Sequence, residues 1–183
     1  ITLGEAYGSY FVLTEGSSIT ALGGDDSLFV DGYIQGSVDL GEGDNSVTVD
    51  GYIDGSALLS FGDGDNSVVV YYDIEGSASL SFGDGNNQVA VGEDFGEDAS
   101  LAFGDGDNMV MVYGYVWGED ASLSFGDGNN TVVVGNDIED AASLSFGDGN
   151  NAVYVYDNIQ DDASLTFGDG DNVVEVYSYI EDN

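Results

Sequence analysis

The side chains of this chain that could carry chemistry are carboxylates, and they recur in loops of the form Gly-Asp-Gly-Asp/Asn-Asn. The first acid of each loop forms one column across the copies, and a second acid follows two residues later in four of them. Carboxylates alternating with glycine carbonyls make an all-oxygen donor set, which suits Ca²⁺ and disfavours softer metals. We therefore expect several calcium ions, held by Glu42, Asp44, Asp63, Asp65, Asp84, Asp105, Asp107, Asp127, Asp148, Asp169 and Asp171.

The amino-acid composition excludes several kinds of binding and catalysis. The chain has 36 Asp and Glu among 183 residues and no Lys, Arg, His or Cys, so its formal net charge is −36. Without a cationic side chain the protein cannot form ion pairs with phosphate groups, so we expect neither nucleic acid nor an anionic membrane surface as a partner. Catalysis by imidazole, amine or thiol is excluded in the same way. The remaining acids recur in every copy without a singular cluster, so we do not expect an enzyme.

A folded chain is nevertheless indicated, because 42% hydrophobic and 12% aromatic residues are typical of globular proteins and not of disordered acidic tracts. No apolar run of about 18 residues exists, so membrane insertion is not expected. The first glycine of each loop recurs every 21 or 22 residues from Gly41 to Gly168. Weaker copies precede them at 23–37 and 7–17. The chain is therefore a repeat array.

Each repeat contains two segments with the period-2 alternation of β-strands. The first places two columns of valine inward, such as Val68 and Val70, and the second places Leu80 and Phe82 inward. An isoleucine column that includes Ile53 closes the core at another turn. One strand pair cannot bury its own face, so the copies must stack. A propeller blade needs a longer repeat, and the antiparallel hairpins of a sandwich would not align identical residues in columns.

We therefore predict an all-β fold, a single parallel β-solenoid of about eight coils, with roughly 21 residues and two main short strands per coil. Residues 1–183 form one domain, in which 1–40 are degenerate first coils and 41–183 are regular coils. Stacking places neighbouring acids of the first column about 4.8 Å apart. Each such pair costs roughly 3.5 kcal/mol at an effective dielectric of 20 before screening. Because the chain has no cationic side chains, cations from solution must neutralise these carboxylates.

Several other features leave alternatives open. An Asn column that includes Asn66 favours a structural amide ladder, whereas the acids after the isoleucine column, such as Glu75, are either a solvated turn or a second ion ladder. Outward serines suit a solvated face, a packing face or O-linked sugars. Outward tyrosines such as Tyr71 suit an interface or a position flanking the core. The 22-residue coil that contains Trp117 suits a bulge or a sugar contact.

The loop Phe-Gly-Asp-Gly-Asp-Asn-Ser-Val-Val at 61–69 and its copies resemble the glycine- and aspartate-rich nonapeptide of RTX (repeat-in-toxin) proteins. The resemblance covers seven loops and implies a Ca²⁺-binding parallel β-roll. Two departures separate this chain from that family. It has one loop per coil where the RTX roll has two nonapeptides, and its Asn66 stands where the motif has Asp. The resemblance therefore implies carboxylate ligands shifted to Asp63, Asp65 and their copies.

The function we expect is that of a non-enzymatic structural protein. It would be a Ca²⁺-stabilised solenoid, extracellular or at the cell surface, where Ca²⁺ is abundant. Copies of the chain would stack head to tail into a filament, surface layer or matrix, because neither end of the sequence offers a polar cap, and lateral association of copies is a second mode that we consider. Two alternatives are an ice-binding solenoid and a repeat segment of a larger secreted RTX-like adhesin. A polysaccharide-active enzyme is disfavoured because no site breaks the repeat.

Overall fold

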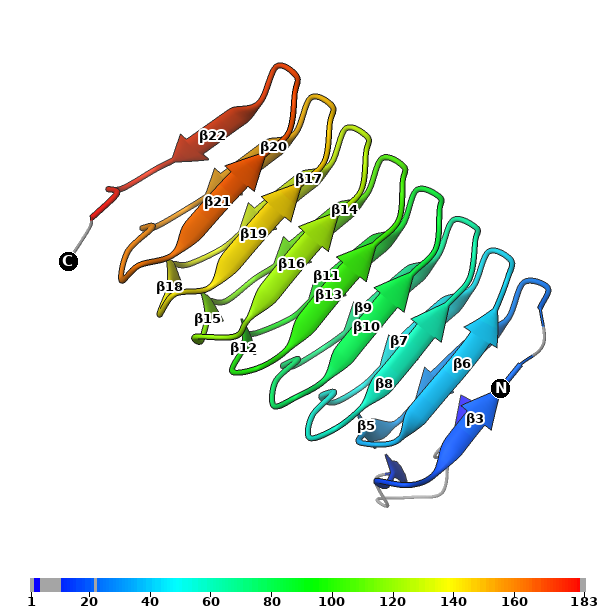
Figure 1. Ribbon diagram of the computed structural model, residues 1–183. Helices are drawn as coiled ribbons and strands as arrows, with labels where there is room; N and C mark the ends of the chain where they lie inside the picture. The colour runs from blue at the N-terminus through cyan, green and yellow to red at the C-terminus, as the bar shows by residue number, and fades with distance from the viewer. Residues whose placement is uncertain (1, 4–10, 22, 182–183) are drawn as a thin grey trace.

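The chain winds into a parallel β-solenoid whose coils stack along one axis (Figure 1). The computed structural model describes residues 2–3, 11–21 and 23–181, and these residues contain strands but no helix. No segment among them is therefore a helix long enough to cross a membrane. About eight turns follow one another roughly 21 residues apart, which confirms the predicted fold class. Of the weakest predicted copy, residues 7–10 lie outside the described residues.

One side of the solenoid is a nine-stranded sheet, here called the Val sheet. Each of its strands from β7 to β22 carries the Val-x-Val pattern of one repeat, and every pair of neighbours is parallel and in register. Its strands are β1 (Thr2–Leu3), β4 (Ser27–Val30), β7 (Ser46–Val49), β9 (Ser67–Val70), β11 (Gln88–Val91), β14 (Met109–Val112), β17 (Thr131–Val134), β20 (Ala152–Val155) and β22 (Val173–Val176).

The opposite side is an eight-stranded sheet, here called the Phe sheet. Its phenylalanines form the column Phe61, Phe82, Phe103, Phe125, Phe146 and Phe167, in which neighbouring ring centroids lie 4.6–4.9 Å apart in nearly parallel planes. The strands are β3 (Ser18–Thr20), β6 (Ser37–Gly41), β8 (Leu58–Phe61), β10 (Ser79–Phe82), β13 (Ser100–Phe103), β16 (Ser122–Phe125), β19 (Ser143–Phe146) and β21 (Ser164–Phe167).

A third, narrower side is built by the isoleucine column, and the sequence did not predict strands there. Isolated parallel bridges join Ile34, Ile53, Ile74 and Phe95 in order, and others join Ile138, Ile159 and Ile180. Between them lies a short sheet of β12 (Phe95–Gly96), β15 (Val116–Trp117) and β18 (Ile138–Glu139), and a separate pair is formed by β2 (Phe11–Leu13) and β5 (Gly32–Ile34). The coil therefore has three sides around one core.

The core is a set of columns in which each side chain packs on its own counterpart in the next coil. Val68, Leu80 and Ile74 of one coil are almost fully buried, as are their counterparts from Leu28 to Val155. The predicted inward columns are thereby confirmed. The apolar surface removed from water by this stacking is the main driving force that the chain offers for folding.

The corner between the Phe sheet and the Val sheet is held by the predicted Asn ladder. Asn66 donates from its backbone N–H and its side-chain amide to Oδ1 of Asn87, at 3.0 and 2.9 Å, and Asn87 repeats this toward Asn108. The same amide also donates to the carbonyls of its own loop, Gly62 and Gly64 for Asn66. The ladder runs from Asn45 to Asn172, and its members up to Asn151 are buried.

The second glycine of each of these loops is required by backbone geometry. Gly64 and Gly85 have φ of 138° and 140°, in a region that favours glycine. A Cβ on Gly85 would also collide with the carbonyl oxygen of Gly64 in the preceding coil. The close stacking of the loops therefore depends on glycine at this position.

Two departures from the regular coil are absorbed locally. A β-bulge shifts the register between Asp39 and Gly41, where the degenerate coils meet the regular ones. The extra residue of the 22-residue coil falls at the turn after Val116, where Gly118 has φ of 112°. The strands on either side, β14 and β16, keep their register with neighbouring coils. The geometry therefore supports the interpretation of this insertion as a local bulge of the coil.

Replacing Asn87 with Ala tests the buried ladder. The change leaves the backbone N–H of Asn66 without its acceptor and the carbonyls of Gly83 and Gly85 without their donor. We expect a loss of about 2–4 kcal/mol in the free energy of unfolding, measured by chemical denaturation. Asn86→Ala is the matched control, because exposed Asn86 accepts one bond, from Asp107, and should cost about 0.5–1.5 kcal/mol. Equal losses would contradict the special role of the buried column.

Candidate functional site

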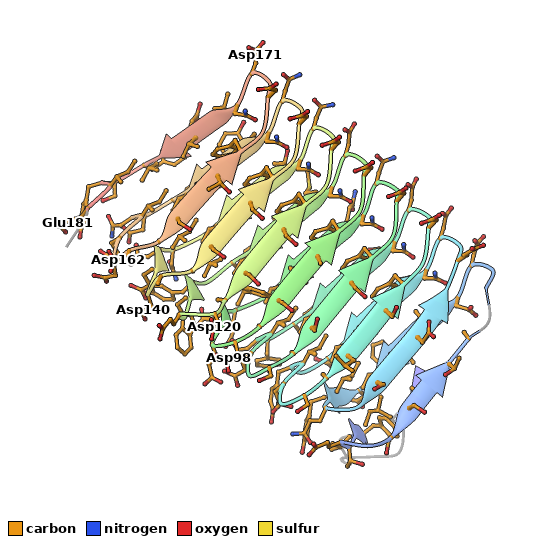
Figure 2. All side chains as sticks on the ribbon, viewed as in Figure 1. Asp98, Asp120, Asp140, Asp162, Asp171 and Glu181 are labelled. Carbon is orange, nitrogen blue, oxygen red and sulfur yellow. The ribbon has the colours of Figure 1, made fainter. Side chains whose placement is uncertain are left out.

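All eleven predicted metal-binding acids lie at one corner of the solenoid, in the turns that lead from the Phe sheet to the Val sheet. Each of these side chains is exposed to solvent. Figure 2 shows this edge, with Asp171 at its far end, and a second acidic edge marked by Asp98, Asp120, Asp140 and Asp162. The acids of the first edge form two columns, which we call column 1 and column 2. Column 1 contains Glu42, Asp63, Asp84, Asp105, Asp127, Asp148 and Asp169, and column 2 contains Asp44, Asp65, Asn86, Asp107, Asn129, Asn150 and Asp171.

The aspartates of column 1 are hydrogen-bonded from coil to coil. Oδ1 of Asp63 accepts the backbone N–H of Asp84 at 2.9 Å, and Oδ1 of Asp84 accepts that of Asp105 at the same distance. The pattern continues through Asp127, Asp148 and Asp169 at 2.7–2.9 Å. Hydrogen bonds from N–H groups to a charged acceptor are stronger than neutral ones, and they offset part of the repulsion between neighbouring carboxylates.

Column 2 forms the same kind of ladder with mixed side chains. Oδ1 of Asp65 accepts the N–H of Asn86, and Oδ1 of Asn86 accepts the N–H of Asp107. The ladder begins at Asp25 of the preceding degenerate coil, which accepts the N–H of Asp44, and all seven bonds from there to Asp171 measure 2.7–3.1 Å, whether the acceptor is a carboxylate or an amide. An amide oxygen therefore also accepts this bond, at 2.9–3.1 Å against 2.7–3.0 Å for the carboxylates. This structural role of the acids was missed in the sequence, although the Asp/Asn exchange within column 2 was a usable signal for it.

Comparing the two columns distinguishes the hydrogen-bonding role of the acids from the role of their negative charge. The aspartates of column 1 from Asp63 to Asp148 accept the same backbone bond as column 2, yet the column carries an acid in all seven copies, Glu42 included, and never Asn. Because the hydrogen bond alone would tolerate an amide, it does not account for the negative charge of column 1. The bonds run to Oδ1, which leaves the second oxygen of each carboxylate outside the ladder.

The donor chemistry of this corner fits a hard cation, but the side chains do not form a closed shell. Within the described residues, no three acidic side chains converge closely enough to hold one metal ion. The carboxylates instead form a row along the solenoid axis, beside the glycine carbonyls of the loops. Such a row suits cations that keep much of their water and contact neighbouring coils, rather than a site with six to eight protein oxygens.

The second acidic corner, after the isoleucine column, is less regular. Its turns place non-glycine residues at positive φ, including Glu97, Asp140 and Asp161 at 52–56°. Amides separate some of its acids, since the Gln160 side chain donates to Glu139 at 2.9 Å. The pKa of Glu75 is raised by burial first and then by the charges of Asp73, Glu97, Asp54 and Asp94. The solvated turn and the second ion ladder both stay predictions for this corner.

The remaining predicted surfaces are outward-facing. Tyr71, Tyr113, Tyr156 and Tyr177 are well exposed, so they do not flank the core, and the last two rings stack at 5.0 Å. The outward serines of the Phe sheet are partly or fully exposed, and the hydroxyl of Ser100 donates to that of Ser79 in the preceding coil. The indole of Trp117 packs on Gly96, where a Cβ would collide with it.

Comparison with known proteins adds no family assignment: no protein-family model, curated protein or solved structure matches the chain. The parallel solenoid fold is therefore established by the structure, while the likeness of the loops to RTX repeats stays a resemblance in sequence.

Substitutions at Asp105 separate its charge from its hydrogen bond. Asp105→Asn keeps an acceptor for the N–H of Asp127 but removes one charge from column 1. We expect it to raise the free energy of unfolding by about 0.5–1 kcal/mol in low salt without divalent cations, and by less in high salt. Asp105→Ala removes the acceptor as well and should be less stable than Asp105→Asn under both conditions. Thermal melts followed by circular dichroism measure both, and a lower stability of Asp105→Asn in low salt would contradict the repulsion.

Glu75→Gln tests the second corner. A carboxyl whose pKa is raised by folding binds protons more readily in the folded state, so its penalty is present above the raised pKa and disappears as the pH falls toward the unfolded value. We expect the substitution to raise the melting temperature by about 1–2 °C at pH 7. The gain should vanish at about pH 4, near the ordinary pKa of Glu. A gain that persists there would show that its cause is not the ionisation of Glu75.

Proposed function

We propose that this chain is a non-enzymatic structural protein: a rigid, extracellular or surface-exposed solenoid whose acidic corner is neutralised by Ca²⁺. The observation that carries the proposal is the persistence of acids in column 1, where an amide would make the same backbone bond. Charge held at seven successive coils, without one cationic side chain in the chain, implies a function for that charge. Binding of divalent cations is the function that the oxygen donors favour.

The residues that would hold the cations are those of column 1, from Glu42 to Asp169, with the acids of column 2 as additional donors. A bound Ca²⁺ would supply positive charge between carboxylates of neighbouring coils. Because no closed shell of side chains exists in the described residues, we expect weak sites, with dissociation constants on the order of 10⁻⁴–10⁻³ M. Such sites are filled where calcium is millimolar, and this supports an extracellular location. The resemblance to RTX repeats supports the same choice of ion.

The uniform repeat supports a structural function over catalysis. Each coil from β8 (Leu58–Phe61) onward repeats the same corner, sheet faces and core columns, and no described acid is set apart as a reactive centre. A stack of in-register coils is stiff and its length is easily changed by adding or removing units. These properties suit a spacer, filament or layer.

Assembly by further stacking is supported by the coil that contains β21 and β22. Val174 and Ile180 of this coil are exposed, whereas their counterparts Val153 and Ile159 are covered by a following coil. The edges of both strands have hydrogen-bonding neighbours on one side only. A further coil would cover this surface, and it can come from a second copy or from additional chain. The first source gives a head-to-tail filament, and the second gives a segment of a larger adhesin.

Calcium titration tests the ion. We expect saturating Ca²⁺ to raise the melting temperature by roughly 5–10 °C over EGTA at equal ionic strength, because ligand binding to the folded state adds to its stability. The triple variant Asp84→Asn, Asp105→Asn, Asp127→Asn should lose most of that increase. The triple variant Asp98→Asn, Asp120→Asn, Asp140→Asn is the matched control, since it removes the same charge from the second corner. Identical melting curves in Ca²⁺ and EGTA would refute the calcium proposal.

Electron microscopy tests the assembly separately. Negatively stained samples of the 183-residue chain should contain filaments or layers in Ca²⁺ and separate particles in EGTA, because neutralised corners allow copies to approach one another. If particles stay monomeric in Ca²⁺ although the melting temperature of the sample responds to the ion, the self-assembly proposal is refuted and the ion-binding proposal stands. The repeat-segment alternative would then be favoured.

A further inference from the structure

One place on the solenoid departs from the repeat and forms a cavity. At the turn between the Val sheet and the isoleucine column, two successive coils carry glycine in the middle position, Gly32 and Gly51. The next coil carries Tyr72 there and the one after it Glu93; a glycine returns once more, at Gly114, but with Glu93 and Asn136 as its neighbours in the column it has no second glycine beside it. The two glycines therefore leave a gap that ends at a tyrosine. The cavity measures about 280 Å³ and is lined by Gly32, Tyr33, Asp50, Gly51, Tyr52 and Tyr72.

The floor of this cavity is backbone. Gly51 stacks directly on Gly32, so closely that a Cβ on Gly51 would collide with the carbonyl oxygen of Gly32. Both glycines are buried, and the backbone N–H of Tyr72 donates to the carbonyl of Gly51 at 3.2 Å. Coil stacking thus requires glycine at 51, and the same requirement keeps the floor free of side chains.

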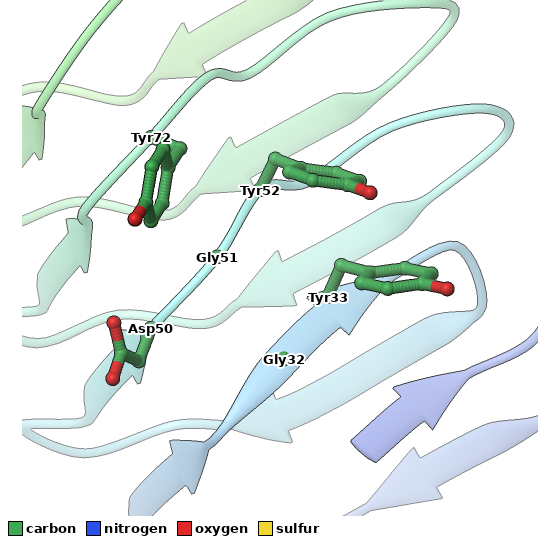
Figure 3. Close-up of a pocket in the computed structure, with 6 residues that line it drawn as sticks. All are labelled: Gly32, Tyr33, Asp50, Gly51, Tyr52 and Tyr72. Carbon is green, nitrogen blue, oxygen red and sulfur yellow. The ribbon is translucent and has the colours of Figure 1, made fainter. Parts of the chain in front are cut away.

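The walls are three tyrosines and one carboxylate. Tyr33 and Tyr52 stack with ring centroids 4.8 Å apart and an interplanar angle of 14°. Figure 3 shows these two rings projecting together on one side of the glycines, with Asp50 on the other side and Tyr72 turned toward it from the next coil. Tyr52, Tyr72 and Asp50 are exposed, so the cavity is open to solvent.

The charge of these walls selects the kind of ligand. Aromatic faces attract cations through the ring quadrupole, and this attraction is used to recognise quaternary ammonium groups. Asp50 adds a carboxylate to the wall. Burial, then Tyr33, and after them the charges of Asp54 and Glu75 raise the pKa of Tyr52, so these two acids also act on this wall. Tyr52 therefore stays a neutral phenol, and the net charge of −36 raises the local concentration of any cation.

We propose that this cavity binds a small organic cation of the quaternary ammonium class, with the trimethylammonium group beside the rings of Tyr52 and Tyr72 and opposite the carboxylate of Asp50. This activity is independent of the calcium corner, which lies at a different turn of the coil. A bare metal ion would find one carboxylate here, too few oxygen ligands for Ca²⁺. The cavity volume lies near the lower end of the range for small-molecule sites, which suits a compact head group better than a polymer segment.

Titration of the full chain with choline, followed by NMR of the backbone amides, tests the proposal. We expect saturable shifts centred on Gly51 and Tyr52, with an affinity on the order of millimolar, because partly exposed cation–π contacts are weak. The neutral isostere 3,3-dimethylbutan-1-ol has the same shape without the charge, and it should bind several-fold more weakly. Glucose is the probe for the competing sugar-site interpretation and should cause no shifts at these residues.

Two substitutions at exposed positions test the walls, and we expect both to preserve the fold. Tyr72→Ala and Asp50→Asn should each weaken choline binding by about two- to fivefold. The effect of Asp50 should diminish at high salt, because interactions between exposed charges are screened. Tyr71→Ala is the matched control, since Tyr71 is the preceding residue and is also exposed but does not line the cavity.

Three results would overturn the proposal. Equal weakening by Tyr71→Ala and Tyr72→Ala would indicate cations gathered diffusely by the acidic surface. Equal affinities for choline and its neutral isostere would show that the positive charge of the ligand does not contribute to binding. Glucose shifts at Gly51 and Tyr52 without choline shifts would assign the cavity to sugars.

Discussion

The physical constraint on which this molecule depends is that each side chain has its own counterpart as its nearest neighbour. In-register parallel stacking places position after position on itself, one coil away. A residue type is therefore acceptable only if it tolerates a copy of itself at about 5 Å, the spacing of neighbouring strands. Valine, leucine and phenylalanine satisfy this by packing, and asparagine satisfies it because one amide both donates and accepts. Stacked aspartates repel one another through their charges, but each one accepts a hydrogen bond from the backbone N–H of the next coil.

This constraint explains where the acids are found. A stacked carboxylate in the interior would meet its neighbour at low dielectric, where repulsion is several times larger than at the surface. The acids are instead concentrated at the corners, where water and ions screen them, and their Oδ1 atoms hold the turns together. The same side chains thus order the loop and leave it highly charged. The first effect needs only an oxygen, while the second needs an ionised group.

Periodicity made the coil predictable from the sequence. The 21-residue spacing and the two-residue alternation define the coil and its inward columns, because a solenoid repeats the same environment at every turn. The third short sheet was not predicted, since single isoleucine positions such as Ile53 carry no alternation. The hydrogen bonds of Asp63 and its copies were also missed, because sequence alone does not show whether a carboxylate turns to solvent or to the next coil. The cavity at Tyr52 was missed because it arises from an interruption of the pattern, two glycines followed by a tyrosine.

The ladders at the acidic corner also give each coil two chemically different faces. Toward the following coil, columns 1 and 2 present Oδ1 acceptors, and the Asn column presents a backbone donor. Toward the preceding coil the pattern is reversed, with backbone donors in the two acidic columns and an amide acceptor in the third. Two following faces brought together would oppose acceptor to acceptor, carboxylate against carboxylate. Coils therefore join in a single polarity, and anything built by extending this solenoid is a directional object whose two ends are never interchangeable.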